Sequence, residues 1–293
     1  MEGTPVPVER RQRDLADLFD LEQVESHEWL GRNDLLQLPQ LFGGQLVGQS
    51  LMAAGLSIGP DKRVHSLHTV FLRAGTSSEP VRYRVEDLHT GRSRSTRQVS
   101  ALQGDRLLCR SLVSAGDDKG GISHARPAPD SGTVEESSPL SALAEDDGGL
   151  GDFWSGFEAI EIRVAPPAED ERVQHPAATH NIWMRAAEPL PDDQLIHRAA
   201  VAYASDLMLM GTAATAHGVP LGHERTLMEQ WWGLSLDHTI WFQDDVRGDD
   251  WIVFEHNAPM AHASRALIQA AAFDRAGRAV CQITQEALLR RRE

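Results

Sequence analysis

The chain has 293 residues and a formal net charge of −15, with 41% hydrophobic and 24% charged residues. This length exceeds what one hydrophobic core usually supports, so we expect two domains. The acidic balance, with no Lys/Arg run apart from Arg290–Arg292, excludes nucleic acid as the main partner, because phosphate neutralisation needs a basic face. A small anionic ligand is not excluded, since a few local arginines are enough to bind one.

Targeting, membrane and metal signals are weak. Residues Met1–Arg10 lack the apolar segment of a signal peptide, and Asp206 interrupts the most apolar stretch, residues 199–216. We therefore expect no membrane span and a cytoplasmic location. Cys109 and Cys281 are too few for a disulfide framework and are expected to be reduced. Histidines at positions 65 and 68 would face opposite sides of a strand, which argues against a zinc site.

In the first part of the chain, apolar spacing predicts an amphipathic helix within Arg10–Leu30. Leu41–Ile58 is apolar on most sides, which predicts a buried helix, and the Gly43-Gly44 pair at its start permits close backbone approach. Alternating or β-branched stretches then predict strands with tight turns between them. These strands cover residues 64–72, 81–88, 94–102 and 106–113.

Residues 115–151 are rich in Gly, Pro and Asp and predict a solvated linker, part of it mobile. Order is expected to resume from Trp154 to Pro167, with a strand at 180–186. Ala199–Met210 then predicts a buried helix that carries the carboxylate of Asp206, and Leu234–Phe242 predicts a buried strand. A carboxylate among apolar neighbours must be satisfied there, so Asp206 is a candidate functional residue.

The second half repeats the first. His68–Arg73 aligns with His238–Gln243 at an offset of 170, and Arg106–Cys109 aligns with Arg278–Cys281 at an offset of 172. Such a repeat indicates duplication of one structural unit. We expect α+β architecture with two tandem repeats, each an antiparallel sheet wrapped around a long central helix. The predicted domains are residues 1–115, a linker at 116–151, and residues 152–293.

Five blocks in order resemble the type II acyl-CoA thioesterases. They are Leu41–Ser50, Val64–Arg73, Tyr203–Leu207, Leu236–Phe242 and Thr284–Glu286. The resemblance implies a double hotdog fold, hydrolysis of acyl-CoA to a carboxylic acid and coenzyme A, and a role in fatty acid and lipid metabolism. It also implies that no metal or organic cofactor is used. We further expect a homo-oligomer.

The family places an Asp, a Thr or Ser, and a Gln around a water molecule. The resemblance puts these roles on Asp206, Ser235 and Gln285, with Ser235 standing where many relatives carry Thr. Ser keeps the hydroxyl but lacks the methyl group that fixes its rotamer. The first half has Gln45 and Val113 at the positions of Asp206 and Gln285, so we expect one site per chain.

Hydrolysis of a thioester requires an activated water and a stabilised oxyanion. Asp206 could take the water's proton, and the backbone amides of Gly43 and Gly44 at a helix start are candidate oxyanion donors. Candidate ligands of the coenzyme A phosphates are Arg94, Arg97 and Arg265, and the candidate lining of the acyl channel is Leu207–Met210.

Structural interpretations stay open beside these. Ser205-Asp206 could cap a helix, Ser235 could bond nearby backbone, Gln285 could face solvent, His238 could serve in the core, and the arginines could simply be solvated. A non-catalytic acyl-CoA-binding protein is one alternative function. A hotdog hydratase or dehydratase is another, and it needs a His base paired with a carboxylate. No Gly-x-Ser-x-Gly elbow supports a serine hydrolase.

Overall fold

The structure is a computed structural model that describes residues 14–33, 36, 38, 40–117, 120–151, 154, 158–166 and 178–293. The predictions for Met1–Arg10 and for Pro167 lie outside these residues. Within them, no helix has both the length and the apolar character needed to cross a lipid bilayer. Cys109 and Cys281 are free and buried, as predicted.

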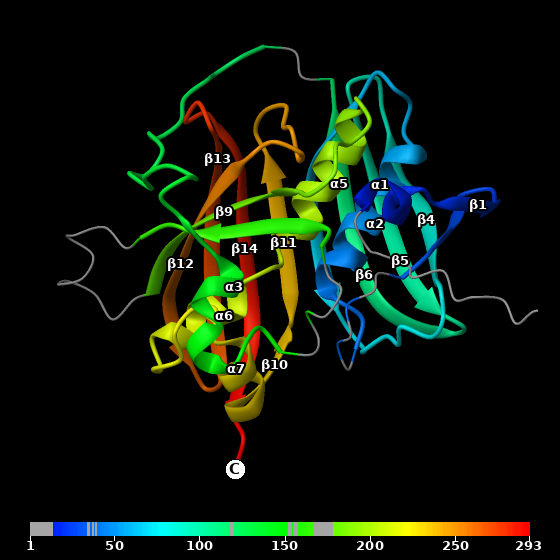
Figure 1. Cartoon of the computed structure of the whole chain (residues 1–293). Coiled ribbons are helices and arrows are strands. Elements are labelled where there is room, and N and C mark those ends of the chain that lie inside the picture. The colour runs from blue at the N-terminus through cyan, green and yellow to red at the C-terminus, as the bar shows by residue number, and fades with distance from the viewer. Residues whose placement is uncertain are drawn as a thin grey trace, which may run out of the picture.

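One antiparallel sheet runs through both halves of the molecule (Figure 1). The halves meet where β3 (Arg63–Phe71) pairs with β11 (Asp237–Phe242). His68 pairs with Thr239 and Thr69 pairs with His238. Because position 68 corresponds to 238 and 69 to 239, this pairing is reciprocal, as a two-fold relation between the repeats requires. The predicted sheet-to-sheet pairing of duplicated halves is confirmed.

The first half wraps its sheet around α2 (Gly43–Leu56), whose side chains are buried from Gly44 to Ala54. Long β-strands supply the cover because their apolar residues alternate toward this helix. Besides β3, the described strands of this half are β1 (Glu22–Glu25), β2 (Glu28–Gly31), β4 (Val81–Thr90), β5 (Arg94–Gln103) and β6 (Arg106–Gly116).

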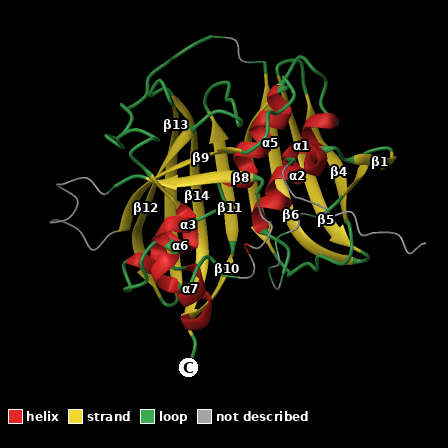
Figure 2. Ribbon diagram, viewed as in Figure 1, coloured by secondary structure: helices red, strands yellow, loops and turns green. Residues whose placement is uncertain are grey.

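The second half follows the same plan with a broken central helix. The helices among the described residues of this half are α5 (Gln194–Ala204), α6 (Leu209–Thr215) and α7 (Glu224–Gln230). Figure 2 shows α5 beside α2, while α6 lies against the second group of strands. The predicted α+β architecture of two tandem repeats is confirmed, with the central helix of this half divided into α5 and α6. The remaining strands are β8 (Ile160–Val164), β9 (Ala178–Ala186), β10 (Trp231–Ser235), β12 (Ile252–His262), β13 (Arg265–Asp274) and β14 (Ala279–Arg291).

The helix predicted within Arg10–Leu30 is confirmed only for a short segment. Only α1 (Leu15–Phe19) is helical among its described residues, and β1 (Glu22–Glu25) forms a hairpin with β2. Pairing of β2 with β4 explains the difference, because Glu28 on β2 accepts hydrogen bonds from Arg82 and Arg84. Tertiary pairing thus overrides the local helical spacing.

Described parts of the predicted linker contain short ordered elements, namely β7 (Ser138–Pro139), α3 (Leu140–Leu143) and the 3₁₀ turn η1 (Glu145–Asp147). β7 pairs with β8 at the end of the sheet. The domain boundaries and the mobility of part of this stretch stay predictions.

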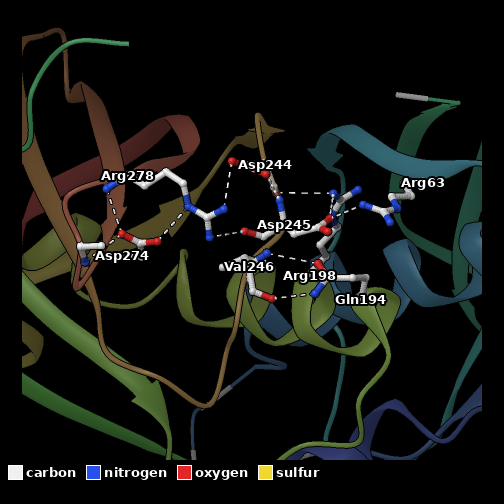
Figure 3. A network of polar contacts seen from close by, with 9 residues as sticks. Arg63, Gln194, Arg198, Asp244, Asp245, Val246, Asp274 and Arg278 are labelled. Atoms are coloured by element: carbon white, nitrogen blue, oxygen red, sulfur yellow. Dashed lines mark hydrogen bonds and ion pairs between the residues drawn. The ribbon is translucent and has the colours of Figure 1, made fainter. Parts of the chain in front are cut away.

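A polar network joins the two halves beside the β3–β11 seam (Figure 3). The carboxylate of Asp245 accepts from Arg63 at 2.6 Å and from Arg198 of α5 at 3.3 Å. Arg278 of the second half donates to Asp244 at 3.1 Å. Single exposed ion pairs contribute little, but this network links β3, α5 and the turn between β13 and β14 through the Asp244–Asp245 loop. It therefore supports the relative placement of the halves.

Candidate active site

Asp206 lies in the break between α5 and α6, so the prediction that it sits within a helix is wrong. Helix α5 ends at Ala204 with Ser205 as its C-cap, and Met208 has a left-handed φ of 65°. A positive φ at a non-glycine residue turns the chain sharply. The turn leaves Asp206 at the end of one helix and before the start of the next, with 8% of its surface exposed.

Ser235 and Gln285 come from neighbouring strands. The predicted strand Leu234–Phe242 is divided into β10 and β11, because the register with β14 slips by one residue around Leu236. Ser235 ends β10 and faces Ala287, while Gln285 lies on β14 and is fully buried. The break turns the Ser235 hydroxyl toward Asp206.

The three predicted residues are brought together, joined by hydrogen bonds that all point toward the carboxylate. Gln285 Nε2 donates to Ser235 Oγ at 3.0 Å, and Ser235 Oγ donates to Asp206 Oδ1 at 3.4 Å. His238 Nδ1 lies 2.6 Å from Gln285 Oε1. An amide oxygen can only accept, so His238 Nδ1 donates and thereby fixes which end of the amide faces Ser235.

Burial raises the pKa of Asp206 above its ordinary value, because the charged form loses hydration. Four neighbours oppose this effect in part. They are the nearby charge of His238 and hydrogen bonds from Gln285, the Gly44 amide and Ser235. The result is a carboxylate that is held in place by donors yet more basic than an exposed aspartate.

The start of α2 lies directly against Asp206. A Cβ atom at Gly43 would stand 2.6 Å from Asp206 Oδ2, so glycine is what allows the carboxylate to approach. The Gly44 amide hydrogen-bonds to the same carboxylate. At Gly44, a Cβ would collide with the backbone oxygen of Tyr203 and with the ring of Phe42. Both glycines thus permit the close approach of the two central helices.

A cavity of about 560 Å³ opens beside Asp206 and Ser235. Both halves contribute to its wall, and most of the lining is apolar, as in Leu46, Leu227 and Trp232. Of the predicted acyl-channel segment, Leu207, Met208 and Met210 line it. Such a space suits an apolar chain ending at the polar cluster.

The three arginines predicted to bind phosphate do not line this cavity. Arg97 is buried and bound to Ser57, His89 and Asp87. Arg265 pairs with Glu286 at 3.2 Å and lines a separate hollow with Arg290 and Arg291. Arg94 is exposed on β5.

Arg73 and Arg292, which sequence reasoning missed, do line the cavity, and both are exposed. Arg73 ends the block Val64–Arg73 that carries the family resemblance, and Arg292 lies in the terminal arginine run. The sequence therefore contained a signal for each of these arginines. His238 also stands in such a block, in Leu236–Phe242. Its fully buried ring bridges Gln285 and Ser205. Glu224, a buried carboxyl group that also lines the cavity, had no signal in the sequence.

The order of elements and the duplicated sheet define a double hotdog protein, and the polar cluster beside an apolar cavity is suited to an acyl thioester. Comparison with known proteins agrees. The acyl-CoA thioesterase N-terminal domain model matches residues 37–116, and the acyl-CoA thioesterase C-terminal domain model matches residues 134–289. The chain therefore belongs to the acyl-CoA thioesterase family.

Individual relatives span nearly the whole chain. Human acyl-coenzyme A thioesterase 8 is 30% identical, over 98% of this chain and 92% of the relative. Acyl-CoA thioesterase 2 of Haemophilus influenzae is 26% identical, over 94% and 96%. The crystal structure of acyl-CoA thioesterase II TesB2 from Mycobacterium marinum matches with a TM-score of 0.78 and 31% identity, over 96% of this chain and 99% of that chain.

Proposed function

We propose that this chain hydrolyses acyl-CoA to a free carboxylic acid and coenzyme A with a water activated by Asp206, Ser235 and Gln285. One observation carries the proposal. Side chains from two strands converge on the Asp206 carboxylate, which lies in a helix break at the wall of an apolar cavity. The family membership independently supports acyl-CoA as the substrate.

The hydrogen bonds suggest a role for each residue. Asp206 would accept the proton of the water, and its raised pKa makes it a stronger base than an exposed carboxylate. Ser235 lines the cavity and would hold the water by its hydroxyl. Gln285 is fully buried and does not line the cavity. Its amide would act by orienting Ser235 and the carboxylate.

For the oxyanion, the Gly43 amide is the better of the two predicted donors. Gly43 lines the cavity, whereas the amide of Gly44 is engaged by Asp206. An amide at a helix start has no partner within the helix and carries the positive end of the helix dipole. Both properties favour a developing negative charge on the thioester oxygen.

One observation favours the hydratase alternative, and another opposes it. His238 Nδ1 lies 3.9 Å from Asp206 Oδ1, which is the His–carboxylate pairing that such chemistry requires. However, the His238 side chain is fully buried, and its nitrogens face Gln285 and Ser205. A base without access to the cavity cannot remove a proton from substrate, so hydrolysis is favoured.

The function is tested by following thiol release with a chromogenic reagent on saturated acyl-CoAs of several chain lengths. We expect release by the wild-type protein. Calorimetric binding of acyl-CoA without release would instead favour a binding protein. Loss of the double bond from an enoyl-CoA without thiol release would favour a hydratase.

Arg73 and Arg292 are the cationic side chains at the cavity that we expect to contact coenzyme A phosphates. The double variant Arg73→Ala/Arg292→Ala should raise KM for acyl-CoA about tenfold, since each phosphate contact is exposed and modest. KM for the matching acyl-pantetheine, which lacks the phosphates of the nucleotide, should stay unchanged. Arg94→Ala, on β5 away from the cavity, is the comparison variant. An equal rise for both substrates would contradict the assignment.

The homo-oligomeric state and the cytoplasmic location stay predictions. Sedimentation velocity of the purified chain tests the first, and fractionation of the source cells tests the second.

A further inference from the structure

Glu224 is a buried carboxyl group in the wall of the same cavity that holds Asp206. It begins α7 and exposes only 8% of its surface. Its Oε1 lies 3.2 Å from the place where a Cβ of Gly211 would stand, a place that Leu221 Cδ1 also approaches to 3.5 Å. A carboxyl group is costly to bury in such surroundings unless something bonds it.

Nothing in the described part of the chain supplies that bond to the Glu224 side chain. Burial, together with the nearby negative charge of Asp147, raises the pKa of Glu224 to about 7. No hydrogen bond opposes the rise, in contrast to Asp206, whose carboxylate receives several. Glu224 therefore offers a hydrogen-bonding group to whatever occupies the cavity.

We propose that Glu224 selects acyl chains that carry a hydroxyl group, by hydrogen bonding to that group within the acyl channel. The inference rests on the proposed function, because it assigns the cavity to the acyl chain. A plain hydrocarbon chain would cover the carboxyl group and leave it without any partner, which lowers affinity. A hydroxyl at the matching position both donates and accepts, so it satisfies either protonation state of Glu224.

The test compares kcat/KM for straight-chain acyl-CoAs with kcat/KM for hydroxylated acyl-CoAs of equal length, with the hydroxyl moved along the chain. For at least one hydroxyl position, the wild-type protein should prefer the hydroxylated substrate. Glu224→Leu should lower this preference at least about tenfold. Glu224→Gln, which keeps hydrogen-bonding capacity, should retain most of it.

Glu229→Gln is the matched control, because Glu229 is exposed on the same helix and does not line the cavity. Its preference should equal that of the wild type, and thermal melts of all variants establish that they are folded. The proposal is overturned if no hydroxyl position is preferred, or if Glu224→Leu leaves the preference unchanged.

Failure of the proposed function is distinguished by its own signal, which is absence of thiol release from every acyl-CoA. In that event, the preference is measured by calorimetry instead, as the ratio of the affinities for non-hydrolysable thioether analogues with and without the hydroxyl. A Glu224-dependent preference in binding supports the inference, and equal binding of both analogues overturns it.

Discussion

Asp206→Asn should lower kcat for acyl-CoA hydrolysis by about 10²–10⁴-fold, the usual contribution of a general base. Asparagine has nearly the same shape and can still accept hydrogen bonds from Ser235 and the Gly44 amide. It cannot take a proton from water at neutral pH. KM and thermal stability should therefore change little, and kinetics of thiol release measure the effect.

The control is Asp237→Asn. Asp237 is a nearby carboxylate that accepts the backbone N–H of Glu286 at 2.8 Å and does not line the cavity. An asparagine oxygen can replace that acceptor, so kcat should stay close to wild type. The kcat of Ser235→Ala should fall between those of Asp206→Asn and Asp237→Asn. Ser235→Thr should keep kcat close to wild type because it keeps the hydroxyl. Equal kcat for wild type and Asp206→Asn would contradict the role given to Asp206.

The same assignment predicts how activity depends on pH. Asp206 acts as a base only when ionised, and burial raises its pKa above the ordinary aspartate value. The wild-type kcat/KM should therefore fall as pH is lowered through that raised pKa, at a higher pH than an exposed aspartate would give. The residual activity of Asp206→Asn should lack this acid limb. An unchanged acid limb in the variant would place the titrating group elsewhere.

Gly44→Ala should destabilise the fold by about 2–3 kcal/mol and lower Tm by roughly 5–10 °C. The added Cβ would collide with the Tyr203 carbonyl oxygen, which belongs to the backbone of α5 and cannot rotate away. The two central helices must separate to accept it. Differential scanning calorimetry measures the loss.

Gly43→Ala is the matched comparison for this prediction. Its Cβ would press on Asp206 Oδ2 and on the ring of Phe71, both ends of side chains that can rotate. We therefore expect a small change in Tm but a clear fall in kcat, because the carboxylate is displaced. If Gly44→Ala melts like wild type, the close approach of α2 and α5 is not required for stability.

The duplicated fold could be predicted because its signals are strong and local. The match of His68–Arg73 to His238–Gln243 anticipated the central β3–β11 seam. The buried helix α2 was evident from its apolar composition on all sides. The N-terminal hairpin was missed because Glu28 is satisfied by Arg82 and Arg84, residues distant in sequence.

The candidate site shows the same division. Its residues came from resemblance, since nothing in the local sequence distinguishes Ser235 or Gln285 from ordinary strand residues. The helix break after Ala204 was not predicted, because alanines on both sides favour a continuous helix. The arginines at the cavity and the buried carboxyl of Glu224 depend on how distant segments fold together, which periodicity does not reveal.

A single turnover in H₂¹⁸O, with enzyme in excess over acyl-CoA, tests the mechanism most directly. If Asp206 activates a water that attacks the thioester, the released carboxylic acid carries one ¹⁸O atom and the Asp206 peptide carries none. Unlabelled acid together with ¹⁸O in the Asp206 side chain would instead indicate that the carboxylate itself attacks, and would contradict the account.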